Sequence, residues 1–288
     1  MNSNYDVIVI GSGPAGYVCA IRCSQLGLKT ALVEKTSDEK DRPVFGGTCL
    51  NVGCIPSKAL LDSSYRYAHA NENLSSHGIL VNNLALDISK MMERKQKIVS
   101  QLTSGISGLL KHNEVTVIQG RGRLLAKHRV EVRYNDNVET YDSANVVLAS
   151  GSEPIEISSV PIDGQHVVDS TGALCFAEVP KRLGIIGAGV IGLELGSVWS
   201  RLGSEVVIFE AMDQFLPNVD QQIARETGKI FANQGLDIRL DTRVTGVQII
   251  DEMVSIEVTI GEEKIQENFD KLIVAVGRRP STDNLFSA

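Results

Sequence analysis

Two stretches of the chain share one pattern of apolar and polar positions. Each begins with an apolar run, continues through a Gly-rich turn and an apolar helical segment, and ends with a second apolar run closed by Glu. Short apolar runs bounded by turn residues are typical of buried parallel strands. The pattern therefore predicts two strand–helix–strand units, at residues 5–34 and 182–210, and an α/β fold.

The spacing of glycines within the two units is the same. In the first unit the glycines are Gly11, Gly13, Gly16 and Gly27, and the closing acid is Glu34; each has a counterpart 176 positions later, at Gly187, Gly189, Gly192, Gly203 and Glu210. Glycines at this spacing allow a tight turn, close approach of a pyrophosphate and close helix packing, and the helix N-terminus favours the phosphates. The duplication predicts two dinucleotide sites.

The acid that closes each unit is placed to accept hydrogen bonds from a ribose. In the second unit, Glu210 suits a ribose with a 2′-hydroxyl and repels a 2′-phosphate. No Arg follows it in the next few positions. The sequence therefore favours NAD over NADP at the second site.

The rest of the chain supplies helices and short strands around these units. Helices are expected at residues 56–71 and 88–112, where apolar side chains recur at helical spacing in the second. Strands are expected at 115–120, 130–134 and 145–150, broken by Gly120 and Gly122, and again at 236–240, 244–250, 253–260 and 270–277. A loop rich in Pro and Ser follows Gly151, so we expect a first domain at 1–150, a second at 151–276 and a closing segment at 277–288.

Composition narrows the class of partner. Of the 288 residues, 43% are hydrophobic and 22% charged, and the net charge is -7 with a pI near 5.3. An acidic surface argues against nucleic acid as the main partner, and no apolar run reaches the ~20 residues of a membrane span. The first strand begins at Tyr5, so no signal peptide is expected. We expect a cytoplasmic protein, or a mitochondrial matrix protein if a transit peptide has been removed.

The segment GGTCLNVGCIPSK, residues 46–58, carries the candidate chemistry. It sets Cys49 and Cys54 five positions apart, close enough for a disulfide with a very short loop. Such a crosslink removes little entropy from the unfolded chain, so redox chemistry explains it better than stability does. Two buried, inert thiols are the alternative. Structural zinc would need a second CxxC pair or histidines at ligand spacing, which are missing, so no metal site is expected.

Cys19 and Cys23 are expected to be packing residues.

The string GGTCLNVGCIPSKALL, together with GAGVIGLELG and AVGRRP, resembles the dihydrolipoamide dehydrogenases among the class I pyridine nucleotide-disulfide oxidoreductases. Glutathione reductases typically read CVPKK where this chain reads CIPSK, and soluble transhydrogenases lack the cysteine pair. Mercuric reductases are the alternative within the family. The resemblance implies two Rossmann-like domains, with FAD bound by residues 1–150 and NAD by an inserted domain at 151–276, and a return to the FAD domain that starts at 277–288.

The resemblance also implies site residues. Cys49 would exchange with dihydrolipoamide, Cys54 would lie beside the flavin, and Lys58 would pair with Glu194 and, with the helix that begins near Cys54, favour a thiolate. FAD would be held by a first set of residues, namely Gly11, Gly13, Gly16, Glu34, Lys35, Gly47, Thr48, Lys58, Gly122, Ser150, Gly151 and Ser152. NAD would be held by a second set, namely Gly187, Gly189, Gly192, Glu194, Glu210, Val244 and Gly277.

Family chains normally continue beyond the point that corresponds to Ala288, into an interface domain that forms the homodimer and carries a His-Glu base. The five histidines of this sequence include none in the expected HPxxxE setting. The resemblance therefore implies little or no turnover by residues 1–288 alone. The alternative is a module that binds the nucleotides without catalysis. The partner implied for the full-length family is dihydrolipoamide on the lipoyl domain of a 2-oxo acid dehydrogenase complex or of the glycine cleavage system.

Overall fold

The computed structural model describes residues 4–72, 74–261 and 263–286. The chain forms two compact units: unit 1 comprises Met1–Pro56, Gln96–Glu153 and Arg279–Ala288, and unit 2 comprises Ser57–Lys95 and Pro154–Arg278. The sequence-based ranges differ from this division, because residues 57–95 pack with the second unit rather than the first. The chain returns to unit 1 at Arg279, where Leu285 O accepts a hydrogen bond of 2.7 Å from Leu124 N.

Unit 1 is built on a six-stranded sheet in the order β3-β2-β1-β6-β5-β4. The first four strands in this order are parallel, and β5 and β4 continue the sheet in antiparallel pairing. The elements that lie wholly in this unit are β1 (Asn4–Ile10), α1 (Pro14–Gln25), β2 (Thr30–Glu34), α2 (Gly47–Val52), β3 (Thr116–Gln119), β4 (Arg121–Ala126), β5 (Arg129–Tyr134) and β6 (Asn137–Leu148).

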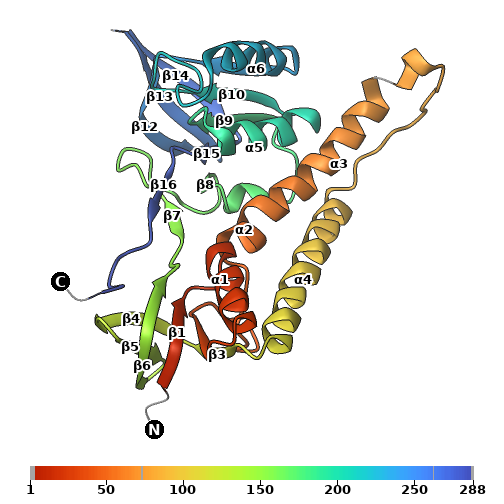
Figure 1. Cartoon of the computed structure of the whole chain (residues 1–288). Coiled ribbons are helices and arrows are strands. Elements are labelled where there is room, and N and C mark those ends of the chain that lie inside the picture. Colours follow the sequence, from red (N-terminus) through yellow and green to blue (C-terminus); the bar gives the residue numbers. More distant parts are fainter. Residues whose placement is uncertain (1–3, 73, 262, 287–288) are drawn as a thin grey trace. The chain divides into compact units, whose positions relative to one another are not determined.

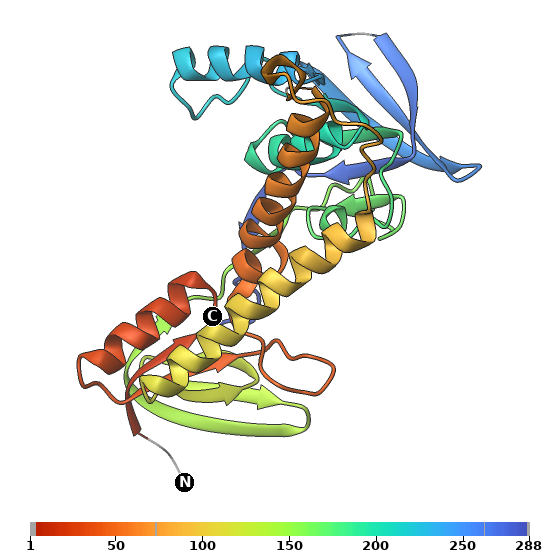
Figure 2. The same cartoon turned by 90° about the vertical axis from the view of Figure 1, so that its right-hand side faces the viewer.

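Alternate side chains of β1 enter two different cores of unit 1. Val7 and Val9 pack with residues of α1 and of the later part of α4 (Ile88–His112). Ile8 and Ile10 pack with Val130 and other residues of the antiparallel strands. Figure 2 shows α1 and the later part of α4 on one face of the parallel strands, and β4 and β5 toward the other face. Successive side chains of a strand point to opposite faces of the sheet, so a strand that is buried on both faces places alternate residues in two different cores.

Unit 2, like unit 1, is built on a sheet with parallel strands. This sheet has five strands, all parallel, in the order β11-β10-β9-β15-β8. A separate antiparallel sheet has the order β12-β13-β14. The elements are η1 (Leu74–His77), β8 (Val167–Asp169), η2 (Gly172–Leu174), β9 (Arg182–Ile186), α5 (Val190–Arg201), β10 (Glu205–Phe209), α6 (Gln221–Asn233), β11 (Leu236–Arg239), β12 (Thr242–Ile250), β13 (Met253–Ile260), β14 (Glu263–Phe269) and β15 (Lys271–Val274).

Four elements cross the division between the units. Helix α3 (Cys54–Glu72) begins in unit 1 and continues in unit 2, and α4 runs the other way. The strands β7 (Ser152–Pro154) and β16 (Arg278–Pro280), which lie where the chain passes between the units, form a two-stranded sheet.

The parallel sheet of unit 2 is covered on both faces. One face packs against α5, through Trp199 and Leu195, and the other packs against the β12–β14 sheet, through Phe269 and Ile256. Figure 1 shows α5 and the β12–β14 sheet on different sides of β9 and β10. Covering of both faces explains why β9 and β10 read as continuous apolar runs in the sequence.

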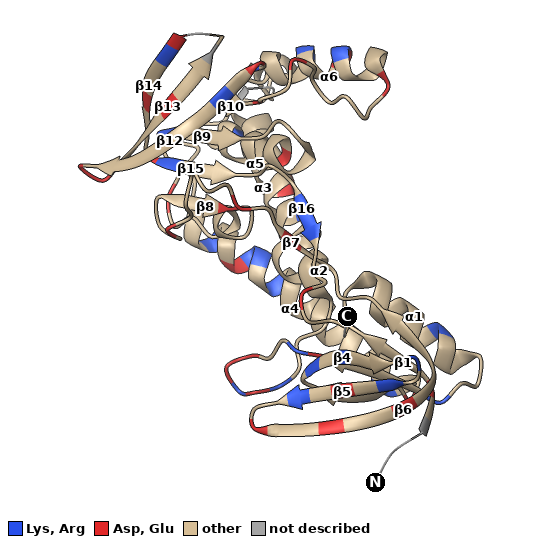
Figure 3. Cartoon of the chain, turned by 90° about the vertical axis from the view of Figure 1, so that its left-hand side faces the viewer, with Lys and Arg blue, Asp and Glu red and all other residues tan. Residues whose placement is uncertain are grey.

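Charged side chains mark the solvated faces of the antiparallel sheets. Arg and Glu alternate on one face of β5, and Glu263 and Lys264 stand at the start of β14 (Figure 3). Across the strands, Arg129 Nε lies 2.8 Å from Asp142 Oδ1, and Lys264 Nζ lies 3.1 Å from Glu257 Oε1. Exposed pairs of this kind contribute little to stability and chiefly keep the strand faces soluble.

Asp163 fixes the loop that leads into β8. Its Oδ1 accepts backbone hydrogen bonds from Gln165 N at 2.7 Å, His166 N at 2.7 Å and Val167 N at 2.9 Å. Partial burial raises the pKa of this carboxyl, but the three N–H donors outweigh it, so the pKa lies below its usual value. The carboxylate therefore adds stability above the unfolded-state pKa of about 3.9, and that stability is lost as the pH falls through the folded-state pKa.

We expect Asp163→Ala to lower the free energy of unfolding at pH 7 by about 1 kcal/mol, a modest value because the side chain is partly solvated. The difference from wild type should shrink when the pH falls below about 3.9. Urea unfolding at pH 7 and pH 3 measures both effects. Asp163→Asn keeps Oδ1 as an acceptor and should lose less at pH 7; equal losses for the two variants would contradict this role.

Candidate functional site

In the Gly-rich turn of unit 1, the backbone after β1 lies in close contact with two other backbone segments, at Ala149 and at Gly47. Gly11 has φ +102°, and a Cβ added to it would lie 2.2 Å from Ala149 O. Gly13 faces Gly47, where an added Cβ would lie 2.7 Å from the Gly13 Cα. Helix α1 begins beside this contact with no side-chain cap. Pro14 has no N–H, and the Gly16 and Tyr17 N–H groups donate to Gly13 O, so the positive end of the helix dipole is what favours an anionic group at this turn. This fits a dinucleotide pyrophosphate.

Glu34 ties this turn to the loop after β2. The side chain is only 6% exposed, and Oε2 accepts from Ser12 N at 3.0 Å and from the Ser12 hydroxyl. Its other oxygen, Oε1, accepts from Thr36 N at 2.7 Å. A carboxylate oxygen can accept two hydrogen bonds, so Oε1, which accepts one, keeps a free lone pair, whereas Oε2 already accepts two. The carboxylate is therefore oriented in advance for the ribose hydroxyls expected there.

The same arrangement recurs in unit 2. Glu210 Oε2 accepts from Ala188 N at 2.9 Å and Oε1 accepts from Met212 N at 2.9 Å. These donors lie 176 positions after Ser12 and Thr36, as Glu210 does after Glu34. Helix α5 also begins without a side-chain cap, and a Cβ added to Gly189 would meet no atom within 4 Å. The space in front of α5 accordingly fits a second pyrophosphate.

Sequence reasoning missed the two backbone donors on either side of each acid. The sequence carried no signal for them, because the donors are backbone N–H groups and the residue types differ between the two copies, Ser12 and Thr36 against Ala188 and Met212. The repeat thus extends beyond the glycines to the hydrogen bonds that hold each carboxylate.

The other residues predicted for FAD lie in unit 1, except Lys58. Lys35 is exposed just after β2, Thr48 is partly buried in α2, and the segment 150–152 follows β6. Gly122 has a packing role that the sequence did not indicate: a Cβ there would lie 3.0 Å from the Ile10 side chain and 3.2 Å from that of Val33. Glycine at this position lets β4 lie over β1 and β2, and its contact with FAD stays a prediction.

Two residues predicted for NAD have distinct settings in unit 2. Val244 is 7% exposed and belongs to the core beneath the β12–β14 sheet, so its side chain contributes to packing. Gly277 has φ +123°, and its carbonyl accepts from Ile155 N at 3.1 Å. Binding of the nucleotide by either residue stays a prediction.

The cysteine pair lies on two consecutive helices of different length. Cys49 is partly buried in α2, and Cys54 is exposed and is the first residue of α3, as expected for a helix beginning near it. Both are thiols in this structure. Asn51, which sequence reasoning did not select, donates to Phe45 O at 3.0 Å and to Gly47 O at 2.9 Å. These bonds fix the turn that carries Cys49.

The ion pair predicted between Lys58 and Glu194 is present in unit 2. Lys58 Nζ lies 2.5 Å from Glu194 Oε1, and the Ser57 hydroxyl donates to Glu194 Oε2 at 3.3 Å. The Glu194 side chain is 27% exposed and that of Lys58 58% exposed. Glu194 lies in the first turn and a half of α5, close in sequence to the Gly-rich turn of that unit. Their location beside a flavin stays a prediction.

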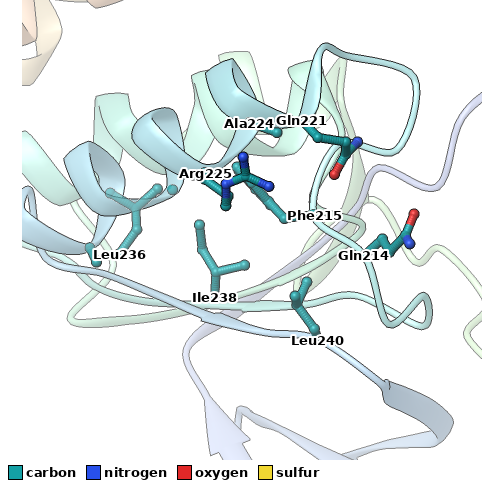
Figure 4. A pocket seen from close by; sticks show the side chains of 10 residues that line it. Gln214, Phe215, Gln221, Ala224, Arg225, Leu236, Ile238 and Leu240 are labelled. Carbon is teal, nitrogen blue, oxygen red and sulfur yellow. The ribbon is translucent and has the colours of Figure 1, made fainter.

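A cavity of about 360 Å³ lies between α6 and β11. Figure 4 shows Leu236, Ile238 and Leu240 along one side and the polar ends of Gln214, Gln221 and Arg225 toward the other. The remaining lining residues are Phe215, Ala224, Gly228 and Ala232. None of the residues predicted for FAD, NAD or the dithiol lines this cavity, so it is separate from the predicted dinucleotide site of unit 2.

Two Rossmann-like units with matched acid-and-glycine turns, and a close cysteine pair in the first, define the class of disulfide oxidoreductases that use two dinucleotides. A family model described as pyridine nucleotide-disulphide oxidoreductase matches residues 5–288. The chain belongs to this family. Family members use FAD and NAD(P) as cofactors.

Curated relatives and solved structures agree with this assignment. The chain is 44% identical over 288 residues to the dihydrolipoyl dehydrogenase of Cupriavidus necator, covering 99% of this chain and 61% of the relative. It is 42% identical over 286 residues to the mitochondrial dihydrolipoyl dehydrogenase of Pisum sativum, covering 97% and 55%. The HOCl-induced flavoprotein disulfide reductase RclA of Escherichia coli, solved as a Cu(II) complex, superposes with a TM-score of 0.82 at 29% identity, over 98% of this chain and 58% of that one.

The chain thus spans less than two thirds of the length of these relatives. Within the described residues, no helix combines the length and apolar character needed to cross a membrane.

We expect Glu210→Gln to narrow the preference for NAD⁺ over NADP⁺ by about tenfold, or ~1.4 kcal/mol. The variant removes the negative charge that repels a 2′-phosphate and weakens the bonds from Ala188 N and Met212 N. Dissociation constants for both nucleotides, measured by calorimetry, test this. Glu205→Gln, at the exposed start of the same strand, makes the same charge change and should leave the ratio unaltered. An equal shift in both variants would show that net charge alone is responsible.

Proposed function

We propose that this chain supplies the FAD site, the NAD site and the redox-active dithiol of a dihydrolipoamide dehydrogenase. The observation that carries the proposal is the segment GGTCLNVGC, residues 46–54, set in a unit whose dinucleotide turn is repeated 176 positions later. The relatives named dihydrolipoyl dehydrogenase, at 42% to 44% identity, support the same substrate. Glu210, a carboxylate held by two backbone N–H groups, supports NAD rather than NADP.

The chain's own residues would divide the work as follows. The Cys49–Cys54 disulfide would accept two electrons from dihydrolipoamide by thiol–disulfide exchange. One substrate thiolate attacks the sulfur of Cys49 and releases Cys54 as a thiolate. The second substrate thiol then displaces Cys49, so that lipoamide leaves as a cyclic disulfide and both cysteines are left reduced. FAD, when bound, carries the two electrons between the dithiol and the nicotinamide. Glu34 orients one ribose and Glu210 the other. Lys58 and Glu194 form an ion pair that would adjust the charge beside the flavin.

Spectroscopy and assay together test the proposal. The purified chain should be yellow, should release FAD on denaturation, and should bind NADH more tightly than NADPH. Dihydrolipoamide should then reduce the bound flavin in a single turnover, while steady-state NADH formation by residues 1–288 alone should be slow. Flavin binding with no reduction by dihydrolipoamide would favour a nucleotide-binding module. Rapid reduction of mercuric ion by NADH or NADPH, with no reduction of the flavin by dihydrolipoamide, would favour the mercuric reductase branch.

A further inference from the structure

Helix α4 places a lysine where its sequence pattern calls for an apolar residue. Met91, Lys95 and Val99 are spaced by four, and their exposed fractions are 7%, 7% and 5%. They share one face of the helix, which is the face that packs inward. A lysine this deeply buried is uncommon unless a partner compensates its charge.

The contacts of Lys95 are few. Its Nζ donates to Leu174 O at 2.6 Å and lies 3.9 Å from the Sγ of Cys175. Among the described residues no carboxylate forms an ion pair with it. The side chain of Cys175 is exposed, although its neighbours Leu174 and Phe176 are buried. The sulfur is thus reachable from solvent on one side and faces a buried nitrogen on the other.

The two side chains bring a sulfur and a nitrogen nucleophile together. Sulfur reacts with oxidants, and an amine nitrogen reacts with oxidised sulfur. All of the atoms concerned lie in unit 2, and none belongs to the predicted dithiol or dinucleotide residues.

We propose that Lys95 and Cys175 form a second redox-active site, which hydroperoxides convert to a reversible sulfur–nitrogen crosslink. In the first step Sγ attacks a peroxide oxygen, the O–O bond breaks and sulfur loses two electrons. The second oxygen takes the thiol proton and leaves as water from hydrogen peroxide, or as an alcohol from an organic hydroperoxide, and the product is a sulfenic acid. In the second step Nζ of Lys95 attacks this sulfur, the S–O bond breaks, and the hydroxyl leaves as water with one proton from nitrogen. Thiols reverse the crosslink by reducing the S–N bond to thiol and amine.

The crosslink would join α4 covalently to the segment after η2. Exposure to an oxidant would therefore modify the chain reversibly at a site separate from Cys49 and Cys54.

Mass spectrometry of the full chain tests the proposal directly. After treatment with hydrogen peroxide and digestion, we expect one species that joins the peptide containing Lys95 to the peptide containing Cys175, lighter than their sum by two hydrogen atoms. Dithiothreitol should restore the separate peptides. Cys175→Ser should abolish the species, whereas the double variant Cys49→Ser/Cys54→Ser should retain it.

Trapping with dimedone supplies the second measurement. Without the lysine nitrogen the sulfenic acid persists, so Lys95→Met should increase dimedone labelling of Cys175 by about fivefold or more. Lys97→Met is the matched control, since Lys97 is exposed on the same helix and should label as wild type does. Circular dichroism checks that Lys95→Met is folded; if it is not, the wild-type crosslink decides alone. Oxidation of Cys175 in folded wild type with no crosslinked species would overturn the proposal.

Discussion

Gly11→Ala is expected to lower the free energy of unfolding by more than about 3 kcal/mol and to abolish flavin binding. Gly11 has φ +102°, a region that L-residues rarely adopt, and the added Cβ would lie 2.2 Å from Ala149 O. The atom it would meet is backbone, at the end of β6, so no side chain can rotate away. Relief requires β1 and β6 to separate at the edge where the dinucleotide is expected.

Gly105→Ala adds the same methyl group and should have the opposite effect. Gly105 lies within α4, and a Cβ there would meet no atom within 4 Å. Helix propensity then predicts a gain of up to about 1 kcal/mol. Denaturant unfolding and flavin content of the two variants should diverge. Similar stabilities of the two variants would show that the Gly-rich turn tolerates a side chain. The close contact of Gly11 with Ala149 O would then not be the reason for a glycine at position 11.

The parts of the fold predicted from sequence are those with strong periodicity. The helix expected at 88–112 coincides with α4, and the strands expected from apolar runs coincide with β1, β2, β9 and β10 to within a residue or two. Strand β4 was not expected, because its Gly and Arg residues read as a turn; it forms because Gly122 packs over Ile10 and Val33. Strand β14 was missed for a related reason, since its exposed polar residues carry little apolar signal.

Tertiary pairing explains what periodicity could not. The strand expected at 145–150 extends back to Asn137, because its first half pairs with β5 and its second half with β1. The expected first domain, 1–150, included residues 57–95, which instead bury Leu60 and Met91 in the core of unit 2. A helix pattern shows that a helix has an apolar face but does not show which sheet that face meets.

Sequence anticipated more of the candidate site than of the packing around it. The carboxylates Glu34 and Glu210 could be placed from spacing alone, because a repeat fixes position in two copies at once. The pairing of Lys58 with Glu194 followed only from the family resemblance, since 136 residues separate them. The burial of Lys95 could not be predicted, because a single Lys in an amphipathic helix is ordinarily assigned to its solvated face.

Replacing either cysteine of the pair should reduce the rate at which dihydrolipoamide reduces the FAD-loaded chain by more than about 10³-fold, because a disulfide couple needs both sulfurs. Cys54 is exposed at the start of α3 and Cys49 is partly buried in α2, so the two variants leave different thiols behind. Stopped-flow absorption under anaerobic conditions measures the single-turnover rate and does not depend on steady-state activity.

The spectra of the two variants should also differ. Cys49→Ser keeps Cys54, the sulfur assigned to the position beside the flavin, and should retain long-wavelength absorption that Cys54→Ser lacks. Cys175→Ser removes an exposed thiol outside the pair and should match the wild-type rate. NADH should still reduce the flavin in every variant, because the NAD turn lies in unit 2 and does not involve the cysteines. A wild-type lipoamide rate in Cys49→Ser would remove the dithiol from the electron path, whereas loss of NADH reduction in all variants would indicate a folding defect.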